Sequence, residues 1–222
     1  MTIVDGRHEP AHVGLIPDGL RRWAHAHGTA LTDAYLLGAE KVTEILVALQ
    51  RNDVRTVSVY NLSRANLARR DAELDAVYEA SVHFFTTLIP AHFDPAACGV
   101  RVHGNPHLLP PRYRAAAHDL EAAMHGADFR INILAAYDAG DEIRAAHRRA
   151  LREGCDINDA FDIADVDLVI RTSPEPLLSG FLPVQSQYAQ LIFSTTPLNE
   201  LTGSHINDLV ADYRRSPQRR GR

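Results

Sequence analysis

Short apolar runs alternate with longer stretches of helical periodicity along nearly the whole chain, and this alternation limits the folds open to it. Six apolar runs have the length of a strand: 12–16, 56–60, 100–103, 129–135, 166–170 and 191–193. Apolar residues recur at helical spacing in further stretches: 35–49, 74–89, 110–125, 140–152 and 203–214. This order predicts an α/β fold, with a central, mostly parallel sheet of about six strands that is flanked by helices and covered on both faces.

The chain contains no internal repeat, low-complexity segment or linker, so we expect a single domain over residues 1–222. Residues 1–10 are polar and predict a flexible N-terminus, and residues 214–222 form an arginine-rich tail. No stretch approaches the ~20 apolar residues of a membrane span. Cys98 and Cys155 lack metal or disulfide spacing. Together these features predict a cytoplasmic protein without stable membrane insertion.

The charge balance argues against a polyanionic partner. The chain has 23 Lys and Arg against 28 Asp and Glu, a formal net charge of −5, so nucleic acid would be repelled on average. Lys41 is the only lysine, and the other basic residues are arginines. Arginine binds phosphate through two parallel N–H donors, but genome composition alone also explains such a bias. We therefore predict no nucleic-acid binding and consider the arginines by their position.

Polar side chains follow three of the predicted strands. They are Asp18, Arg21, Arg22, Ser63, Asn66, Arg69 and Arg171. Because ligands of open α/β sheets bind beyond the carboxyl ends of the strands, these side chains should meet at one edge. One carboxylate among several arginines suits a divalent cation and a phosphate group.

Four segments, in order, resemble the motifs of the cis-prenyltransferase, or undecaprenyl diphosphate synthase, family. Residues 12–24, HVGLIPDGLRRWA, resemble H-V-A-x-I-M-D-G-N-G-R-W-A, and residues 60–69, YNLSRANLAR, resemble Y-A-F-S-x-E-N-W-x-R. Residues 166–172 with Ser179 resemble D-L-x-I-R-T-x-G-E-x-R-x-S-N-F, and residues 214–221 resemble the closing R-x-R-R-F-G. The resemblance implies the cis-prenyltransferase fold, Mg²⁺ as cofactor, allylic diphosphates as substrates and a homodimer.

The resemblance also implies the roles of individual residues. The catalytic positions are Asp18, Arg22 and Asn66, and Asp18 would hold the metal. The diphosphate-binding positions are Gly19, Leu20, Arg21, Arg22, Ser63, Arg69, Arg171, Ser179, Arg219 and Gly221, the last two reaching a partner's site. The hydrophobic pocket would contain Trp23, Tyr35, Leu62, Leu67, Val77, Tyr78 and Phe85. As a pattern, the apolar stripe 74–89 is equally typical of an ordinary buried helix face.

Several positions depart from the family pattern, and they belong to the same implied pocket. They are Leu20, Arg21, Leu31, Tyr35, Ala65, Leu67, Leu177 and Gln190. Leu177 replaces an arginine at the site that holds isopentenyl diphosphate, and Gln190 replaces a metal-binding glutamate, which makes it a doubtful ligand. The string P-D-G-x-R-R-W resembles the subgroup that makes irregular, branched terpenoids, the lavandulyl, cyclolavandulyl and isosesquilavandulyl diphosphate synthases.

These departures predict a prenyltransferase of the irregular type, serving secondary metabolism. It would join dimethylallyl or geranyl diphosphate to dimethylallyl diphosphate in a head-to-middle condensation. Two alternatives remain open at this point. The chain could make a short regular cis-prenyl diphosphate from isopentenyl diphosphate, or it could be a non-catalytic partner subunit of a heteromeric prenyltransferase.

Overall fold

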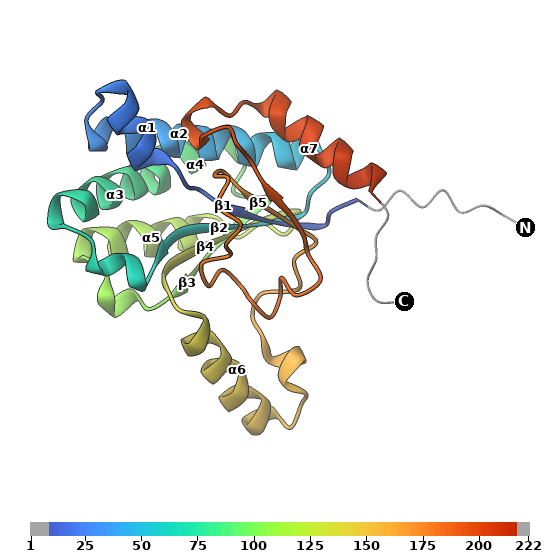
Figure 1. Cartoon of the computed structure of the whole chain (residues 1–222). Helices are drawn as coiled ribbons and strands as arrows, with labels where there is room; N and C mark the ends of the chain where they lie inside the picture. Colours follow the sequence, from blue (N-terminus) through green and yellow to red (C-terminus); the bar gives the residue numbers. More distant parts are fainter. Residues whose placement is uncertain (1–8, 217–222) are drawn as a thin grey trace, which may run out of the picture.

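The computed structural model of the chain describes residues 9–216. In this range six strands form one sheet, and all neighbouring pairs run parallel (Figure 1). They are β1 His12–Ile16, β2 Thr56–Ser63, β3 Cys98–Gly104, β4 Phe129–Tyr137, β5 Leu168–Arg171 and β6 Gln190–Phe193, in the spatial order β3-β4-β2-β1-β5-β6. The predicted α/β class is confirmed, with the more specific result that these strand pairs are all parallel.

The helices lie where the periodicity predicts them, with small differences at their ends, except for the helix over residues 20–27, which the periodicity does not predict. They are α1 Leu20–His27, α2 Leu31–Arg51, α3 Asp71–His83, α4 Ile89–His92, α5 Pro111–Ala123, α6 Ala139–Glu153 and α7 Gly203–Arg215. A π-helical turn, η2 Phe84–Leu88, joins α3 to α4, and a short 3-10 turn, η1 Ala65–Ala68, follows β2. Within residues 9–216, none of the helices combines the length and apolar character that crossing a membrane requires.

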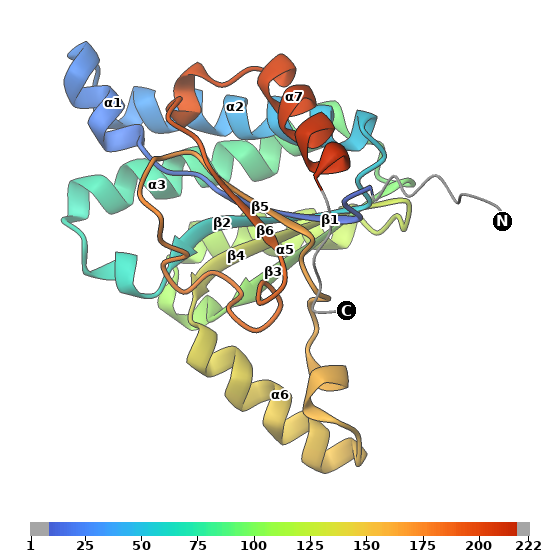
Figure 2. The same ribbon diagram turned by 45° about the vertical axis from the view of Figure 1, so that its right-hand side comes forward.

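One face of the sheet carries the main hydrophobic core. Helices α2, α3, α5 and α7 contribute buried side chains to a cluster with β1, β2 and β4. Val13 and Leu15 of β1 and Ile45 and Leu46 of α2 are completely buried in it. Burial of one such side chain contributes roughly 1.5–3 kcal/mol to folding, so this layer provides much of the driving force. Figure 2 shows α2 and α7 together on this side.

The opposite face is covered mainly by two irregular segments, residues 161–167 and 172–189, rather than by packed helices. Ile163, Val166, Phe181 and Leu182 of these segments form a smaller cluster with β1, β4 and β5. A Cβ on Gly14 of β1 would lie 2.5 Å from the ring of Phe181, so the approach requires glycine there. Helix α6 extends away from the sheet (Figure 1). Both faces are covered, as predicted, but the helical layer is thicker on one side.

A chain of buried polar side chains crosses the strands on this second face. The Nδ1 atom of His12 lies 3.1 Å from the Ala164 carbonyl oxygen and 3.0 Å from that of Asp165, while Nε2 lies 2.8 Å from Ser58 Oγ. Because carbonyl oxygens only accept hydrogen bonds, Nδ1 carries the proton of a neutral ring. Burial lowers the pKa of His12, against the opposing effect of these carbonyls and of two nearby aspartates.

Replacing His12 with Asn should flatten the dependence of the unfolding free energy on pH. The unfolded chain takes up a proton at the usual histidine pKa of 6.5, while the folded protein resists protonation of His12. The wild type should therefore lose stability as the pH falls below that value, by about 1.4 kcal/mol per unit of pKa difference. Urea unfolding at neutral and mildly acidic pH measures this. Asn at the exposed His118 is the control and should leave the slope unchanged; an unchanged slope in the His12 variant would contradict the assignment.

Candidate active site at the carboxyl edge of the sheet

A cavity of about 660 Å³ opens at the carboxyl edge of the sheet. It is lined by residues at or after the ends of β1, β2 and β5 and by residues of α1, α2 and α3. Of the site residues predicted from the sequence, it brings together Asp18, Gly19, Leu20, Arg21, Arg22, Tyr35, Ser63, Asn66, Arg69, Val77, Arg171 and Ser179. The convergence expected at one edge of a parallel sheet is therefore present.

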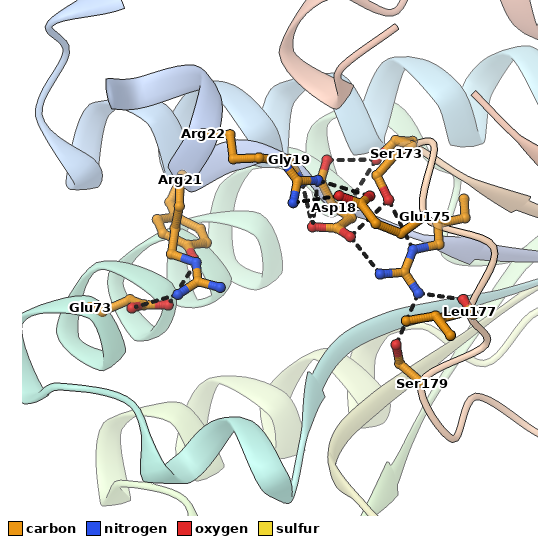
Figure 3. Close-up of polar contacts among 12 residues, drawn as sticks. Asp18, Gly19, Arg21, Arg22, Glu73, Ser173, Glu175, Leu177 and Ser179 are labelled. Atoms are coloured by element: carbon orange, nitrogen blue, oxygen red, sulfur yellow. Dashed lines mark hydrogen bonds and ion pairs between the residues drawn. The ribbon is translucent and has the colours of Figure 1, made fainter. Parts of the chain in front are cut away.

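Asp18 follows β1, and other groups of the chain hold its carboxylate in place (Figure 3). Its Oδ2 accepts hydrogen bonds from Arg171 Nη2 at 2.6 Å and Ser173 Oγ at 2.9 Å. Its Oδ1 accepts one from the Gly19 N–H at 2.6 Å. Partial burial alone would raise the pKa of Asp18, but these hydrogen bonds outweigh burial and the pKa lies below its ordinary value. The carboxylate is therefore ionised at neutral pH.

Arg171 ends β5 and is almost fully buried, at 7% exposure. Besides Asp18, its guanidinium donates from Nε to Ser173 Oγ at 2.9 Å and from Nη1 to Ser179 Oγ at 2.9 Å and to the Leu177 carbonyl. The resemblance predicts that Arg171 and Ser179 contact a diphosphate. In the structure, these two side chains bond to each other and brace the loop that follows β5.

Arg22 of α1 lies opposite Glu175, a residue that the sequence analysis did not single out. The Nη1 atom of Arg22 is 2.9 Å from Glu175 Oε1, and its Nη2 donates to Oε2 at 3.2 Å. A third carboxylate oxygen, Asp18 Oδ1, is 3.6 Å away. Glu175 occupies the glutamate of the R-T-x-G-E pattern, and this was the signal available for finding it.

Backbone turns position two further parts of the site. Gly19 precedes α1 with a φ of 93°, a left-handed conformation that favours glycine. Its N–H is directed to Asp18, so this amide serves the turn rather than a ligand. Ser63 and Asn66 close the turn after β2, because the Ser63 N–H donates to Asn66 Oδ1 at 3.3 Å and the Asn66 N–H donates to Ser63 Oγ at 3.1 Å.

Arg21, Tyr35 and Arg69 form a second polar group in the cavity wall. Arg69 Nη1 donates to the hydroxyl oxygen of Tyr35 at 3.3 Å. Burial raises the pKa of Tyr35, and the positive charge of Arg69 acts in the opposite direction. Both arginines face Glu73 of α3, to which Figure 3 shows Arg21 pointing. Glu73 is the second functional candidate that the sequence analysis missed, because a single glutamate on a helix gives no signal of burial.

Part of the predicted hydrophobic pocket lies in the cavity wall. Tyr35 and Val77 line the cavity, together with Ala80, Ser81 and Phe84 of the same helical stretch as Val77. Tyr78 and Phe85 were also predicted there, but their rings pack on Tyr113 of α5, with centroid distances of 6.0 and 5.1 Å. The apolar stripe predicts a buried helix face, but the residues facing the cavity lie on the adjacent face.

Three other residues of the predicted pocket lie elsewhere. Leu62 packs in the main core and is 1% exposed. The β2–β4 register shifts on both sides of Leu62, and this interrupts the regular alternation of side chains between the two faces of the sheet. Leu67 packs against the same core from η1. Trp23 lines a separate cavity of about 270 Å³, donates from Nε1 to Glu200 at 3.0 Å and stacks on His27. These placements correct the pocket prediction at Leu62, Leu67 and Trp23.

Gln190 cannot share an ion with Asp18 within one chain. Gln190 begins β6 and pairs with Leu168, the first residue of β5, whereas Asp18 follows the end of β1. In a parallel sheet these positions are at opposite edges, which corrects the doubtful metal assignment of Gln190. The other distant candidates, Arg219 and Gly221, lie outside the described residues.

Within residues 9–216, the carboxylates that line this cavity are those of Asp18 and Glu175. Residues 9–216 contain no group of three or more His, Cys, Asp or Glu side chains that could hold an ion. Mg²⁺ is commonly bound by one or two carboxylates together with water and substrate phosphates. The residues present therefore fit an Mg²⁺ ion that arrives with a diphosphate, and Asp18 would then exchange one of its hydrogen bonds for the ion.

An acid beside several arginines at the carboxyl edge of an α/β sheet is the arrangement typical of proteins that bind small phosphorylated ligands. The family model described as putative undecaprenyl diphosphate synthase matches residues 16–221. The chain belongs to this family, the cis-prenyltransferases, and membership supports prenyltransferase activity on isoprenyl diphosphates.

The relatives match over nearly the whole chain. A tritrans,polycis-undecaprenyl-diphosphate synthase (geranylgeranyl-diphosphate specific) of Thermoplasma acidophilum is 30% identical and covers 96% of this chain and 89% of its own. Isoprenyl transferase 1 of Streptomyces avermitilis is 33% identical, over 83% of this chain and 78% of its own. The structure of lavandulyl diphosphate synthase from Lavandula x intermedia, in complex with dimethylallyl diphosphate, superposes with a TM-score of 0.85 at 20% identity, over 95% and 97% of the two chains. That likeness confirms the fold.

Replacing Arg171 with Met should destabilise the folded protein by about 2–3 kcal/mol, because it leaves the half-buried Asp18 carboxylate without its cationic partner. Adding Asp18→Asn to this variant should recover part of the loss. Chemical denaturation measures both values. Arg149→Met, which removes an exposed arginine paired with Glu153 and Asp162, is the control and should cost clearly less than Arg171→Met, because solvent screens exposed ion pairs. Equal losses of unfolding free energy in the two single variants would show that the Asp18–Arg171 pair stabilises the fold no more than the exposed ion pair of Arg149.

Proposed function

We propose that the chain joins an allylic donor, dimethylallyl or geranyl diphosphate, to dimethylallyl diphosphate in a head-to-middle condensation that yields a branched, lavandulyl-type diphosphate for secondary metabolism. One observation carries the proposal. Arg21 lies in the cavity wall where the family pattern has a glycine, whereas Leu177, at the position of an arginine, is 59% exposed and outside the lining. Cationic charge has thus moved within the site, which favours a changed acceptor. The lavandulyl diphosphate synthase that shares this fold was crystallised in complex with dimethylallyl diphosphate.

The cavity has room for short substrates. Its volume of about 660 Å³ lies within the range typical of small-ligand sites, so two five-carbon units, or a five- and a ten-carbon unit, fit with their diphosphates at the polar mouth.

The reaction would proceed by ionisation of the donor. Its C–O bond breaks, the diphosphate departs with the electron pair, and Arg22 and Arg69 stabilise the negative charge as it develops. The internal alkene carbon of dimethylallyl diphosphate then forms the new C–C bond with the allylic cation. A proton leaves the resulting cation to restore an alkene, and an oxygen of the departed diphosphate is the acceptor that we assign.

The remaining residues would bind and orient the substrates. Mg²⁺, when bound, supplies positive charge to the leaving diphosphate, and Asp18 would hold it. Arg171 and Ser179 would hold the acceptor diphosphate, with Arg21 contributing part of the charge that Leu177 lacks. Asn66 fixes the turn beside the donor. We further propose that the protein works as a cytoplasmic homodimer in which Arg219 and Gly221 reach the partner's site.

Incubation of the full chain with Mg²⁺, dimethylallyl diphosphate and geranyl diphosphate tests the proposal, with the dephosphorylated products identified by mass spectrometry and NMR. We expect branched products without added isopentenyl diphosphate. Linear products that require isopentenyl diphosphate would contradict head-to-middle condensation and favour the regular alternative.

Asp18→Ala should reduce kcat by about 10²–10³-fold while the protein stays folded, because it removes the carboxylate that would hold the metal. Steady-state kinetics measure this loss. Ala at Asp119, an exposed aspartate of α5, is the matched control and should keep wild-type turnover. Absence of turnover of all three diphosphates in both the wild type and this control would contradict the proposed condensation and favour the alternative of a non-catalytic partner subunit.

A further inference from the structure

Glu73 is a buried acid that lies behind the cavity wall. It belongs to the first turn of α3, and its side chain is 4% exposed. A carboxylate at this depth is costly unless cations compensate its charge. Two arginines from different parts of the chain do so, Arg21 of α1 and Arg69, which follows η1. Both arginines line the cavity, while Glu73 itself does not.

The contacts hold the two guanidinium groups while using few of their N–H donors. Glu73 Oε1 lies 3.4 Å from Arg21 Nε and 3.1 Å from Arg69 Nη1, and Oε2 accepts a long hydrogen bond of 3.5 Å from Arg21 Nη1. Oε1 is nevertheless without a hydrogen-bonding partner among the residues described. Arg69 Nη1 donates to Tyr35 instead. The carboxylate therefore attracts both guanidiniums by charge and leaves N–H groups for another acceptor.

The exposure of the two arginine side chains indicates that this acceptor would come from the cavity. The side chain of Arg21 is 58% exposed and that of Arg69 is 25% exposed, so both can meet a ligand from the cavity. The pair carries two positive charges against the single charge of Glu73, which leaves an excess for an anion. A diphosphate has oxygens far enough apart to accept from two guanidiniums together.

We propose that Glu73 is a positioning residue, whose buried carboxylate holds Arg21 and Arg69 side by side so that they bind one diphosphate group jointly. This inference rests on the diphosphate site of the proposed function and adds to it a residue that touches no substrate. It also gives Arg21, which replaces the glycine of the family pattern, a defined partner. The clamp of Arg21, Arg69 and Glu73 is separate from the group around Asp18, and Figure 3 shows Arg21 and Glu73 apart from that group.

Two roles of Glu73, an effect through its charge alone and the positioning of the two arginines, predict opposite results for Glu73→Gln. If Glu73 acted only through its charge, removing it would make the cavity more positive and diphosphate would bind more tightly. If Glu73 positions the arginines, its loss lets them separate, and binding weakens although the cavity has become more positive. Isothermal titration of the full chain with inorganic diphosphate and Mg²⁺ distinguishes these outcomes.

We expect Glu73→Gln to raise the Kd for inorganic diphosphate about tenfold, the size of effect typical of residues that orient a binding group. Glu79→Gln, which removes an exposed glutamate from the same helix, is the matched control and should leave the Kd unchanged. Circular dichroism and thermal unfolding establish that each variant is folded. Unchanged or tighter binding by folded Glu73→Gln would overturn the proposal and leave the proposed prenyl transfer standing.

Arg21→Lys provides a second test at an exposed position, where misfolding is not expected. Lysine keeps the charge but cannot present two N–H groups to both oxygens of Glu73. We expect a Kd about threefold to tenfold above wild type, and no further increase when Glu73→Gln is added, since both changes break the same contact. Wild-type affinity in Arg21→Lys, or additive effects in the double variant, would overturn the proposal. If the wild type binds no inorganic diphosphate, both the clamp and the diphosphate site are wrong.

Discussion

The ion pair between Asp18 and Arg171 is the interaction on which the site depends. It joins the carboxyl ends of β1 and β5, two adjacent strands in the middle of the sheet, through residues 153 positions apart in the sequence. Arg171 is buried and Asp18 is partly buried, so each needs the other to compensate its charge. Ser173, Ser179 and the Leu177 carbonyl are all arranged by bonds to Arg171, and the loop after β5 takes its form from them.

Around this pair the cavity has two polar sides with different supports. One side is the loop after β5 with Arg22 and Glu175, and the other is the clamp of Arg21, Arg69 and Glu73. In each, an acid holds an arginine that faces the cavity. Four arginines (Arg21, Arg22, Arg69 and Arg171) meet three acids (Asp18, Glu73 and Glu175), so the positive excess lies on the side of the clamp, while the whole chain remains net acidic, at −5.

Much of the fold and of the location of the site could be predicted from the sequence. The residues that were placed wrongly share a common cause. The period of an apolar pattern predicts a helix, but it does not show which adjoining face meets a cavity. Tyr78 and Phe85 were therefore assigned to the pocket, although Val77 and Phe84 line it and the other two pack on α5. Likewise, resemblance placed Gln190 beside the metal, whereas the sheet register places it at the opposite edge from Asp18.

The sequence by itself determined the parallel α/β architecture, the edge at which the site lies and the residues from Asp18 to Arg171 that gather there. The reason is local, since alternating apolar periods specify strands and helices, and parallel strands bring their carboxyl ends together. Tertiary structure alone decided which acid pairs with which arginine. Glu73 and Glu175 have no local signal for their partners, because burial and charge compensation arise only when α1, α3 and the loop after β5 meet in the fold.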